Sequence, residues 1–248
     1  MRSVIFTSYF SRKKHPNDPN DPHVVGRTHD GRVIQNDISY IKIWYESVKS
    51  LNIEGRIFCD DLNEDFIKEF STDKISFVKV EPSEFSNNDW RFFCYKEYLK
   101  DNKFDAVFLT DGSDVKVVKD PMQIVEENPD YDLFVGKDSL KLEEFPYLDV
   151  HQTVGWEDFI WFSVMAKKLD LINMGVIGGK QDQVENFLNV FWDTRVKLER
   201  PEFNSDMWTG QYVFRHLLSD KKILIGEPLT SDFKKYQNDR TDVFFIHK

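Results

Sequence analysis

Short apolar runs alternate with longer amphipathic segments along the first half of the chain. Apolar runs of this length predict buried strands, and apolar residues that recur at helical spacing predict helices. The predicted strands cover residues 3–7, 55–62, 75–80 and 106–109, and the predicted helices cover residues 38–51 and 89–100. Strands that alternate with helices favour an α/β fold with a mainly parallel central sheet flanked by helices.

The second half of the chain is less regular and rich in aromatic residues. Residues 131–136 predict another strand, and residues 170–180 (DLINMGVIGGK) predict either a pair of strands or a strand followed by a turn. Helices are predicted over residues 181–198 and 207–218, and late strands over residues 223–226 and 243–248. The sequence shows no internal repeat and no linker between the two halves, so we expect a single domain over residues 1–248.

Composition and charge limit the classes of function. A chain of 248 residues is long enough to bury a large core, and its net charge of −10 without a Lys/Arg cluster argues against a nucleic-acid partner. Cys59 and Cys94 lie in apolar segments, which predicts free buried thiols in a reducing compartment. The sequence shows neither a signal peptide nor a transmembrane segment, so we expect a cytoplasmic protein, with peripheral membrane contact left open.

Residues 104–121 (FDAVFLTDGSDVKVVKDP) contain the most informative polar cluster, in which an apolar run stops at Asp111 and Asp114. A surface turn is one interpretation, because Asp, Gly and Ser are common in turns. A metal site is the other, because Mg²⁺ and Mn²⁺ prefer carboxylate oxygens together with substrate phosphates. Asp60 and Asp138 also follow predicted strands, whose carboxyl ends open the binding crevice of such sheets. Gly112 would let the backbone approach a diphosphate or ribose closely.

This segment resembles the DxD region of GT-A-fold glycosyltransferases, in which an apolar strand precedes an acidic turn, a short apolar run and Asp-Pro. The resemblance implies a Rossmann-like domain that binds Mn²⁺ or Mg²⁺ and a nucleoside-diphosphate sugar. Residues 1–120 would bind the nucleotide, and residues 121–248 would bind the sugar and the acceptor. Asp111 and Asp114 would hold the metal and the ribose. The spacing here is DxxD, so the division of roles between these two residues stays open.

The resemblance also implies contacts around the donor nucleotide. Thr7 and Ser8 would bond the base or the ribose, and Tyr9 would stack on a ring, although an ordinary transition from strand to loop is the alternative. Asp60 would reach the base. Arg91 would contact the diphosphate or the sugar, with a solvated helix arginine as the alternative.

Two later segments complete the resemblance. Residues 172–179 (INMGVIGG) resemble the family's Asn/Gly-rich stretch, in which Gly175 and Gly178 would let the backbone pass close to the donor sugar and Asn173 would hydrogen-bond it. A glycine turn between strands is the alternative. His247 follows the last apolar run and would be the third metal ligand, and Lys248 would touch the diphosphate.

The expected reaction is transfer of a sugar from a nucleoside-diphosphate sugar, with UDP favoured, to a carbohydrate-type acceptor on a glycan, lipid or protein. The metal and a nearby Arg91 or Lys248 would stabilise the leaving diphosphate. Asn173 and Asp206 would orient the sugar or the attacking hydroxyl, and Asp206 and Asp138 are the candidate bases. Asp206 also fits a helix N-cap. The resemblance favours retention of configuration.

Two other functions share parts of this pattern. A sugar nucleotidyltransferase would need a Gly-rich, basic phosphate loop after the first strand, but SYFSRKK contains no glycine. DGSDV is also similar to the DxSxS metal-adhesion motif of von Willebrand A-type binding modules. The second serine of that motif is replaced by Val115, which cannot bind a metal.

Overall fold

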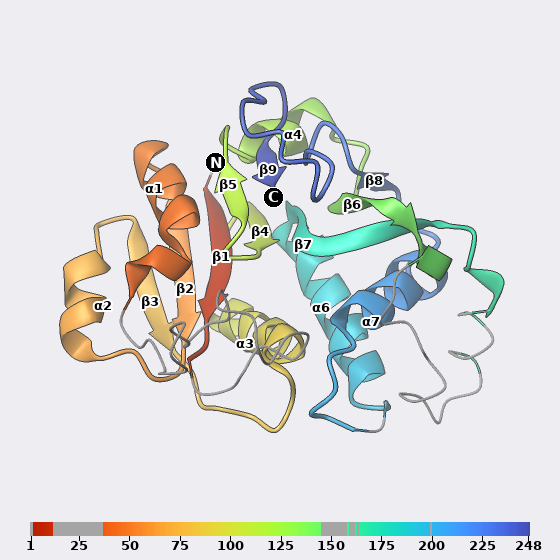
Figure 1. The fold of residues 1–248 in the computed structure, drawn as a ribbon, viewed down its shortest axis with the longest axis horizontal. Coiled ribbons are helices and arrows are strands. Elements are labelled where there is room, and N and C mark those ends of the chain that lie inside the picture. Colours follow the sequence, from red (N-terminus) through yellow and green to blue (C-terminus); the bar gives the residue numbers. More distant parts are fainter. Residues whose placement is uncertain (1, 12–36, 145–157, 159–161, 163, 199) are drawn as a thin grey trace.

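A seven-stranded sheet forms the centre of the protein, in the order β3–β2–β1–β4–β7–β6–β8 (Figure 1). The computed structural model describes residues 2–11, 37–144, 158, 162, 164–198 and 200–248. The strands are β1 (Ser3–Tyr9), β2 (Glu54–Cys59), β3 (Ile75–Lys79), β4 (Ala106–Thr110), β6 (Leu133–Lys141), β7 (Asp170–Lys180) and β8 (Ile223–Ile225). Strands β3, β2, β1 and β4 are mutually parallel, as are β6 and β8, whereas β7 is antiparallel to both neighbours. The predicted α/β class is therefore confirmed.

Helices cover both faces of the sheet. One face packs against α1 (Lys42–Ser50), α2 (Glu64–Phe70) and α4 (Met122–Glu127), and the other against α3 (Asn87–Asp101), α6 (Gln181–Arg195) and a π-helical turn (Val213–Leu217). Alternate residues of β4 serve the two faces, since Phe108 packs with α1 and α4 while Leu109 packs with α3 and α6. In α1, Trp44, Tyr45 and Val48 form the buried face that the helical spacing predicts. A helix begins at Asn87 because the side chain of Ser86 accepts a hydrogen bond from the backbone N–H of Asp89.

The strand order contains a switch point between β1 and β4. The chain passes from β1 outward to β2 and β3, and then returns to the other side of β1 as β4. Crevices open at the carboxyl ends of parallel strands where the order reverses in this way. The halves 1–120 and 121–248 share one sheet, because β4 pairs with β7 from Ala106↔Lys180 to Thr110↔Val176.

Residues 170–180 form one long strand, so the prediction of a strand pair or a strand–turn was wrong. The glycines lie within β7, where β4 pairs with it in continuous register. On the other side the register against β6 breaks, since Val135 pairs with Ile177 but Gly136 pairs with Asn173. This irregularity is a bulge in β7 at Gly175, and bulges of this kind often re-aim residues beside binding sites.

A second, two-stranded sheet stands beside the carboxyl end of β4. It consists of β5 (Val115–Val117) and β9 (Phe245–His247), which pair antiparallel with Val115 opposite His247. In Figure 1 this pair of strands lies above β4, and the C-terminus of the chain lies beside it.

Cys59 and Cys94 are free and buried, as predicted. Within the described ranges, no helix combines the length and apolar character needed to cross a bilayer.

Gly178 packs against the core and not against a ligand. A Cβ atom at this position would lie 2.1 Å from Cδ1 of Phe108. Because the ring of Phe108 fills this space, the predicted close approach of the donor sugar to Gly178 is not supported.

We predict that Gly178→Ala lowers the free energy of unfolding by about 1–3 kcal/mol, because the added methyl group overpacks the core against Phe108. Urea denaturation followed by circular dichroism measures the change. Adding Phe108→Leu should recover part of the loss, since the two residues are in contact and their effects should not add. An unchanged free energy of unfolding in Gly178→Ala would contradict this packing.

Candidate metal centre

Three side chains that can bind a metal ion meet where β4 ends. Nε2 of His247 lies 3.7 Å from Oδ2 of Asp111 and 3.5 Å from Oδ2 of Asp114. One ligand atom from each residue lies within 4.8 Å of the others. The turn after β4 supplies both carboxylates, and the β5–β9 ladder brings His247 to them. The sequence prediction that these three residues converge is confirmed.

His247 is buried with an unsatisfied nitrogen. Its side chain is 2% exposed, and Nε2 has no hydrogen-bond partner among the described residues. The backbone N–H of His247 donates a hydrogen bond to Ser231 Oγ at 3.0 Å. The centroid of the Phe233 ring lies 4.3 Å from the centroid of the imidazole. Burial acts to lower the pKa of His247, but the charges of Asp114 and Asp111 outweigh it, and the pKa is raised. Nε2 therefore faces two carboxylates, and a metal ion bound there would take the place of a proton on this nitrogen.

Gly175 leaves the space that the cluster fills. A Cβ atom there would lie 2.1 Å from Cε1 of His247 and 2.7 Å from Oδ2 of Asp111. The bulge is fixed by hydrogen bonds, because Asp111 N–H donates to the carbonyl of Gly175 at 2.9 Å and Gly175 N–H donates to Oδ1 of Asn173 at 2.7 Å. Asn173 therefore fixes the backbone beside the cluster, and the absence of a side chain at Gly175 leaves room for Asp111 and His247.

The donor set fits a hard or borderline divalent cation. Carboxylate oxygens suit Mg²⁺ and Mn²⁺, and imidazole suits Mn²⁺ better than Mg²⁺. Three protein ligands would leave coordination positions for further oxygen ligands.

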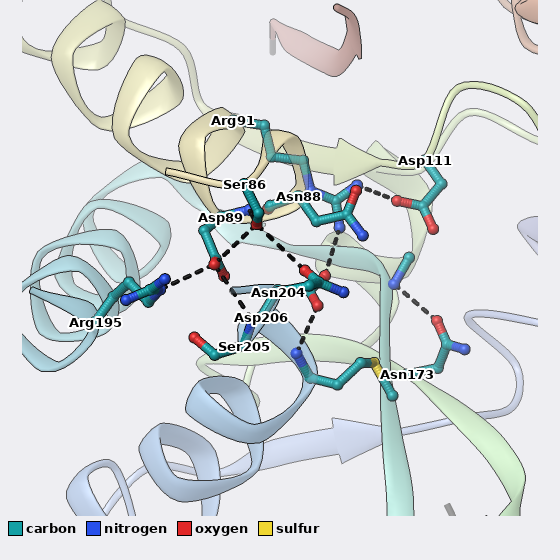
Figure 2. Close-up of polar contacts among 12 residues, drawn as sticks. Ser86, Asn88, Asp89, Arg91, Asp111, Asn173, Arg195, Asn204, Ser205 and Asp206 are labelled. Atoms are coloured by element: carbon teal, nitrogen blue, oxygen red, sulfur yellow. Dashed lines mark hydrogen bonds and ion pairs between the residues drawn. The ribbon is translucent and has the colours of Figure 1, made fainter. Parts of the chain in front are cut away.

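Arg91 lies between the carboxylates of Asp111 and Asp206 (Figure 2). Its Nη1 donates to Oδ1 of Asp111, and its Nη2 lies 3.4 Å from Oδ2 of Asp206. Arg91 is 6% exposed, so the sequence alternative of a solvated helix arginine was wrong. Its pKa is raised because the charges of Asp111 and Asp206 outweigh the effect of burial.

Asp206 is the first residue of α7 (Asp206–Tyr212), one position after the N-cap residue Ser205. Its Oδ1 accepts a hydrogen bond from Met207 N–H at 2.8 Å. Burial raises the pKa of Asp206 to about 7, with the charges of Asp89 and Asp111 adding to the shift and Arg91 opposing it. Burial therefore favours the protonated form of this carboxyl group.

Three residues that were predicted to contact the nucleotide are engaged within the protein instead. Tyr9 is 1% exposed, and its ring packs between Tyr40 and Phe66, so stacking on a base is not supported. Oδ1 of Asp60 accepts hydrogen bonds from the backbone N–H and the hydroxyl of Ser11. A Cβ atom at Gly112 would lie 2.8 Å from Oγ1 of Thr7, so Gly112 serves close packing on β1.

The remaining predicted residues take different positions around the site. Thr7 is fully buried beneath Gly112, and Ser8 is half-buried near the end of β1. Asp138 lies within β6, and its charge helps to raise the pKa of His247. The backbone N–H of Lys248 donates to the carbonyl of Asp114 at 3.0 Å.

Sequence reasoning missed two aromatic residues and one lysine beside the cluster. Tyr40 is half-buried near Asp111 and Asp114, whose charges add to burial in raising the pKa of its hydroxyl. Phe233 covers the ring of His247, and Nζ of Lys234 lies 5.1 Å from the Phe233 ring centroid. The sequence around Tyr40 and around Phe233 and Lys234 carries no motif of a binding site, because tertiary contacts alone bring these residues to the cluster.

No protein-family model matches this chain, and no curated protein is significantly similar in sequence.

We predict that Gly175→Ala weakens Mn²⁺ binding by about 10-fold or more, the scale of effect seen when groups beside metal ligands are changed. The methyl group would displace His247 or Asp111 from the cluster. Isothermal titration with Mn²⁺ measures the affinity. Gly55→Ala, which crowds Trp44 on α1 instead, controls for general destabilisation. Equal Mn²⁺ affinity in wild type and Gly175→Ala would contradict the assignment.

We also predict a pH dependence of stability that comes from Asp206. Its pKa in the folded protein, about 7, lies above the ordinary value of 3.8, so the folded state binds the proton more tightly. The free energy of unfolding therefore falls as the pH rises between these two values. Asp206→Asn should remove this contribution, which is of the order of a few kcal/mol. Urea denaturation across this pH range gives the comparison, and identical pH profiles for the two proteins would refute the shift.

Proposed function

We propose that this protein is a metal-dependent glycosyltransferase that uses a nucleoside-diphosphate sugar as donor. The observation that carries the proposal is the convergence of Asp111, Asp114 and His247 at the carboxyl end of β4. That end adjoins β1, at the switch point where open α/β sheets bind nucleotides. The resemblance of residues 104–121 to the DxD region supports a nucleotide-sugar, with UDP favoured, over other phosphorylated ligands.

The chemistry follows from where charge develops. When bound, a divalent cation would supply Lewis-acid stabilisation of the leaving diphosphate. Asp111, Asp114 and His247 would hold this cation. Ser8, near the end of β1, and Tyr40, near Asp111 and Asp114, would contact the ribose and the base. A carbohydrate-type acceptor would approach from the side of β6 and β7.

Asp138 is the carboxylate we favour for contact with the reacting sugar. Among the described residues it accepts one hydrogen bond, from Leu140 N–H to Oδ1 at 3.2 Å, and its charge reaches His247. Both oxygens of Asp206 are engaged, one by Met207 N–H and the other by Arg91. Retention of configuration remains the favoured stereochemistry by resemblance.

Lys234 or Lys248 is a better candidate than Arg91 for the basic side chain that assists the leaving diphosphate. Arg91 is buried and paired with two carboxylates. Lys234 is exposed and lies over Phe233, which contacts His247. An exposed, flexible ammonium group can bind a diphosphate reversibly as it enters and leaves the site.

Two alternatives remain to be separated by experiment. A sugar nucleotidyltransferase would share the sheet and the metal, but it would release pyrophosphate from a nucleoside triphosphate and a sugar phosphate. An adhesion module of von Willebrand A type is disfavoured, because Val115 is fully buried in β5 opposite His247.

We predict that UDP binds in a Mn²⁺-dependent manner and that Asp114→Asn abolishes this binding, because it removes one carboxylate of the cluster. Isothermal titration of UDP and GDP with and without Mn²⁺ tests the prediction, with the exposed Asp73→Asn as a matched control. Incubation with a panel of nucleotide-sugars should show slow donor hydrolysis. Binding that does not depend on Mn²⁺, no binding, or pyrophosphate release would refute the proposal.

A further inference from the structure

We propose that Arg91 and Asp206 are positioning residues that hold the metal ligand Asp111, and that Arg91 does not contact the donor. This inference rests on the metal site of the proposed function. It assigns a role that differs from the one the sequence resemblance implies for Arg91.

The two oxygens of Asp111 face different partners. Oδ1 accepts from Nη1 of Arg91, whereas Oδ2 points toward Nε2 of His247 at 3.7 Å and toward the space left by Gly175. One oxygen is thus held by the protein, and the other is presented to the cluster. A hydrogen bond of this kind orients a carboxylate that could bind a metal ion.

Arg91 stands on the inner side of Asp111. The exposed fraction of the side chain falls from 29% at Asp111 to 8% at Arg91 and 5% at Asp206. Nε of Arg91 donates to the carbonyl of Asn88 at 3.1 Å, so each of the three guanidinium nitrogens contacts the protein. A donor diphosphate that approaches from solvent therefore meets Asp111 before it meets Arg91.

Asp206 holds the other end of Arg91. Its Oδ2 faces Nη2 of Arg91, and its Oδ1 is fixed by Met207 N–H. The planar guanidinium group can address two carboxylates at once, which an ammonium group cannot do with the same geometry. Figure 2 shows Arg91 between Asp111 on one side and Asp206 on the other.

A buried ion pair anchors this arrangement. Asp89 and Arg195 are fully buried, and Oδ2 of Asp89 accepts hydrogen bonds from Arg195 Nε at 2.9 Å and from Ser205 N–H at 3.2 Å. Asp89 lies in the first turn of α3, which carries Arg91, and Ser205 directly precedes Asp206. Arg195 also donates to the carbonyls of Arg200, Pro201 and Phe203. The start of α3 and the start of α7 are consequently fixed relative to each other.

The test measures Mn²⁺ affinity and needs no acceptor. Arg91→Lys keeps the charge but loses the planar group, and Asp206→Asn keeps the shape but loses the charge. Each should weaken Mn²⁺ binding by about 10- to 100-fold, the usual effect of removing a group that orients a metal ligand. Arg56→Lys is the matched control, since Arg56 is a partly buried arginine paired with Glu54 on β2. Circular dichroism and thermal unfolding show whether each variant folds, and Asp206→Asn carries the test if Arg91→Lys does not fold.

A second titration separates positioning from donor contact. At Mn²⁺ concentrations that saturate each variant, UDP should bind Arg91→Lys as it binds the wild type. Loss of UDP affinity that persists at saturating Mn²⁺ would overturn the inference, and so would wild-type Mn²⁺ affinity in both variants. These results would leave the proposed metal site intact. Failure of the wild-type protein to bind Mn²⁺ would instead refute the site and the inference together.

Discussion

The antiparallel contact between β4 and β7 is the constraint on which the rest of the structure depends. It joins the parallel strands of the first half to the second half, and it places the bulge at Gly175 against the turn at Asp111. Because Asp111 N–H bonds to the carbonyl of Gly175, the acidic turn and the bulge take their positions together. The candidate metal centre is therefore a product of sheet pairing and does not rest on a loop that folds by itself.

Basic and acidic side chains alternate next to the candidate metal centre. Asp111 lies between His247 and Arg91, and Arg91 lies between Asp111 and Asp206. Buried carboxylates are costly unless they are paired, so each of these groups depends on its neighbour for its place in the interior. Asp89 and Arg195 form a second ion pair, in which both side chains are fully buried. Polar groups therefore link α3, α6 and α7 beneath the candidate centre.

Hydrophobic patterning was sufficient to predict the α/β class and most elements, because buried strands and amphipathic helices carry local periodicity. It did not predict that Asp111, Asp114 and His247 converge, because the β5–β9 ladder, and not the parallel sheet, brings His247 to the carboxylates; that prediction came from the resemblance to the DxD region. It failed for residues 170–180, where glycines suggest a turn but pairing with β4 holds them in a strand. The donor contacts that the resemblance implied for Tyr9 and Gly178 are not supported, because distant residues pack against both positions and leave no local signal in the sequence. Tyr40 and Lys234 reach the site only through tertiary contacts.

The pairing of β5 with β9 has a kinetic consequence. Asp114 and His247 are far apart in the sequence, so bringing them together has a large entropic cost of loop closure. Formation of the main sheet reduces this cost, because it brings the two segments near each other first. The short β5–β9 ladder adds few contacts of its own and should form after β1, β2 and β4 have associated. During refolding, the chain should therefore form its core before it brings together the three side chains of the candidate metal centre.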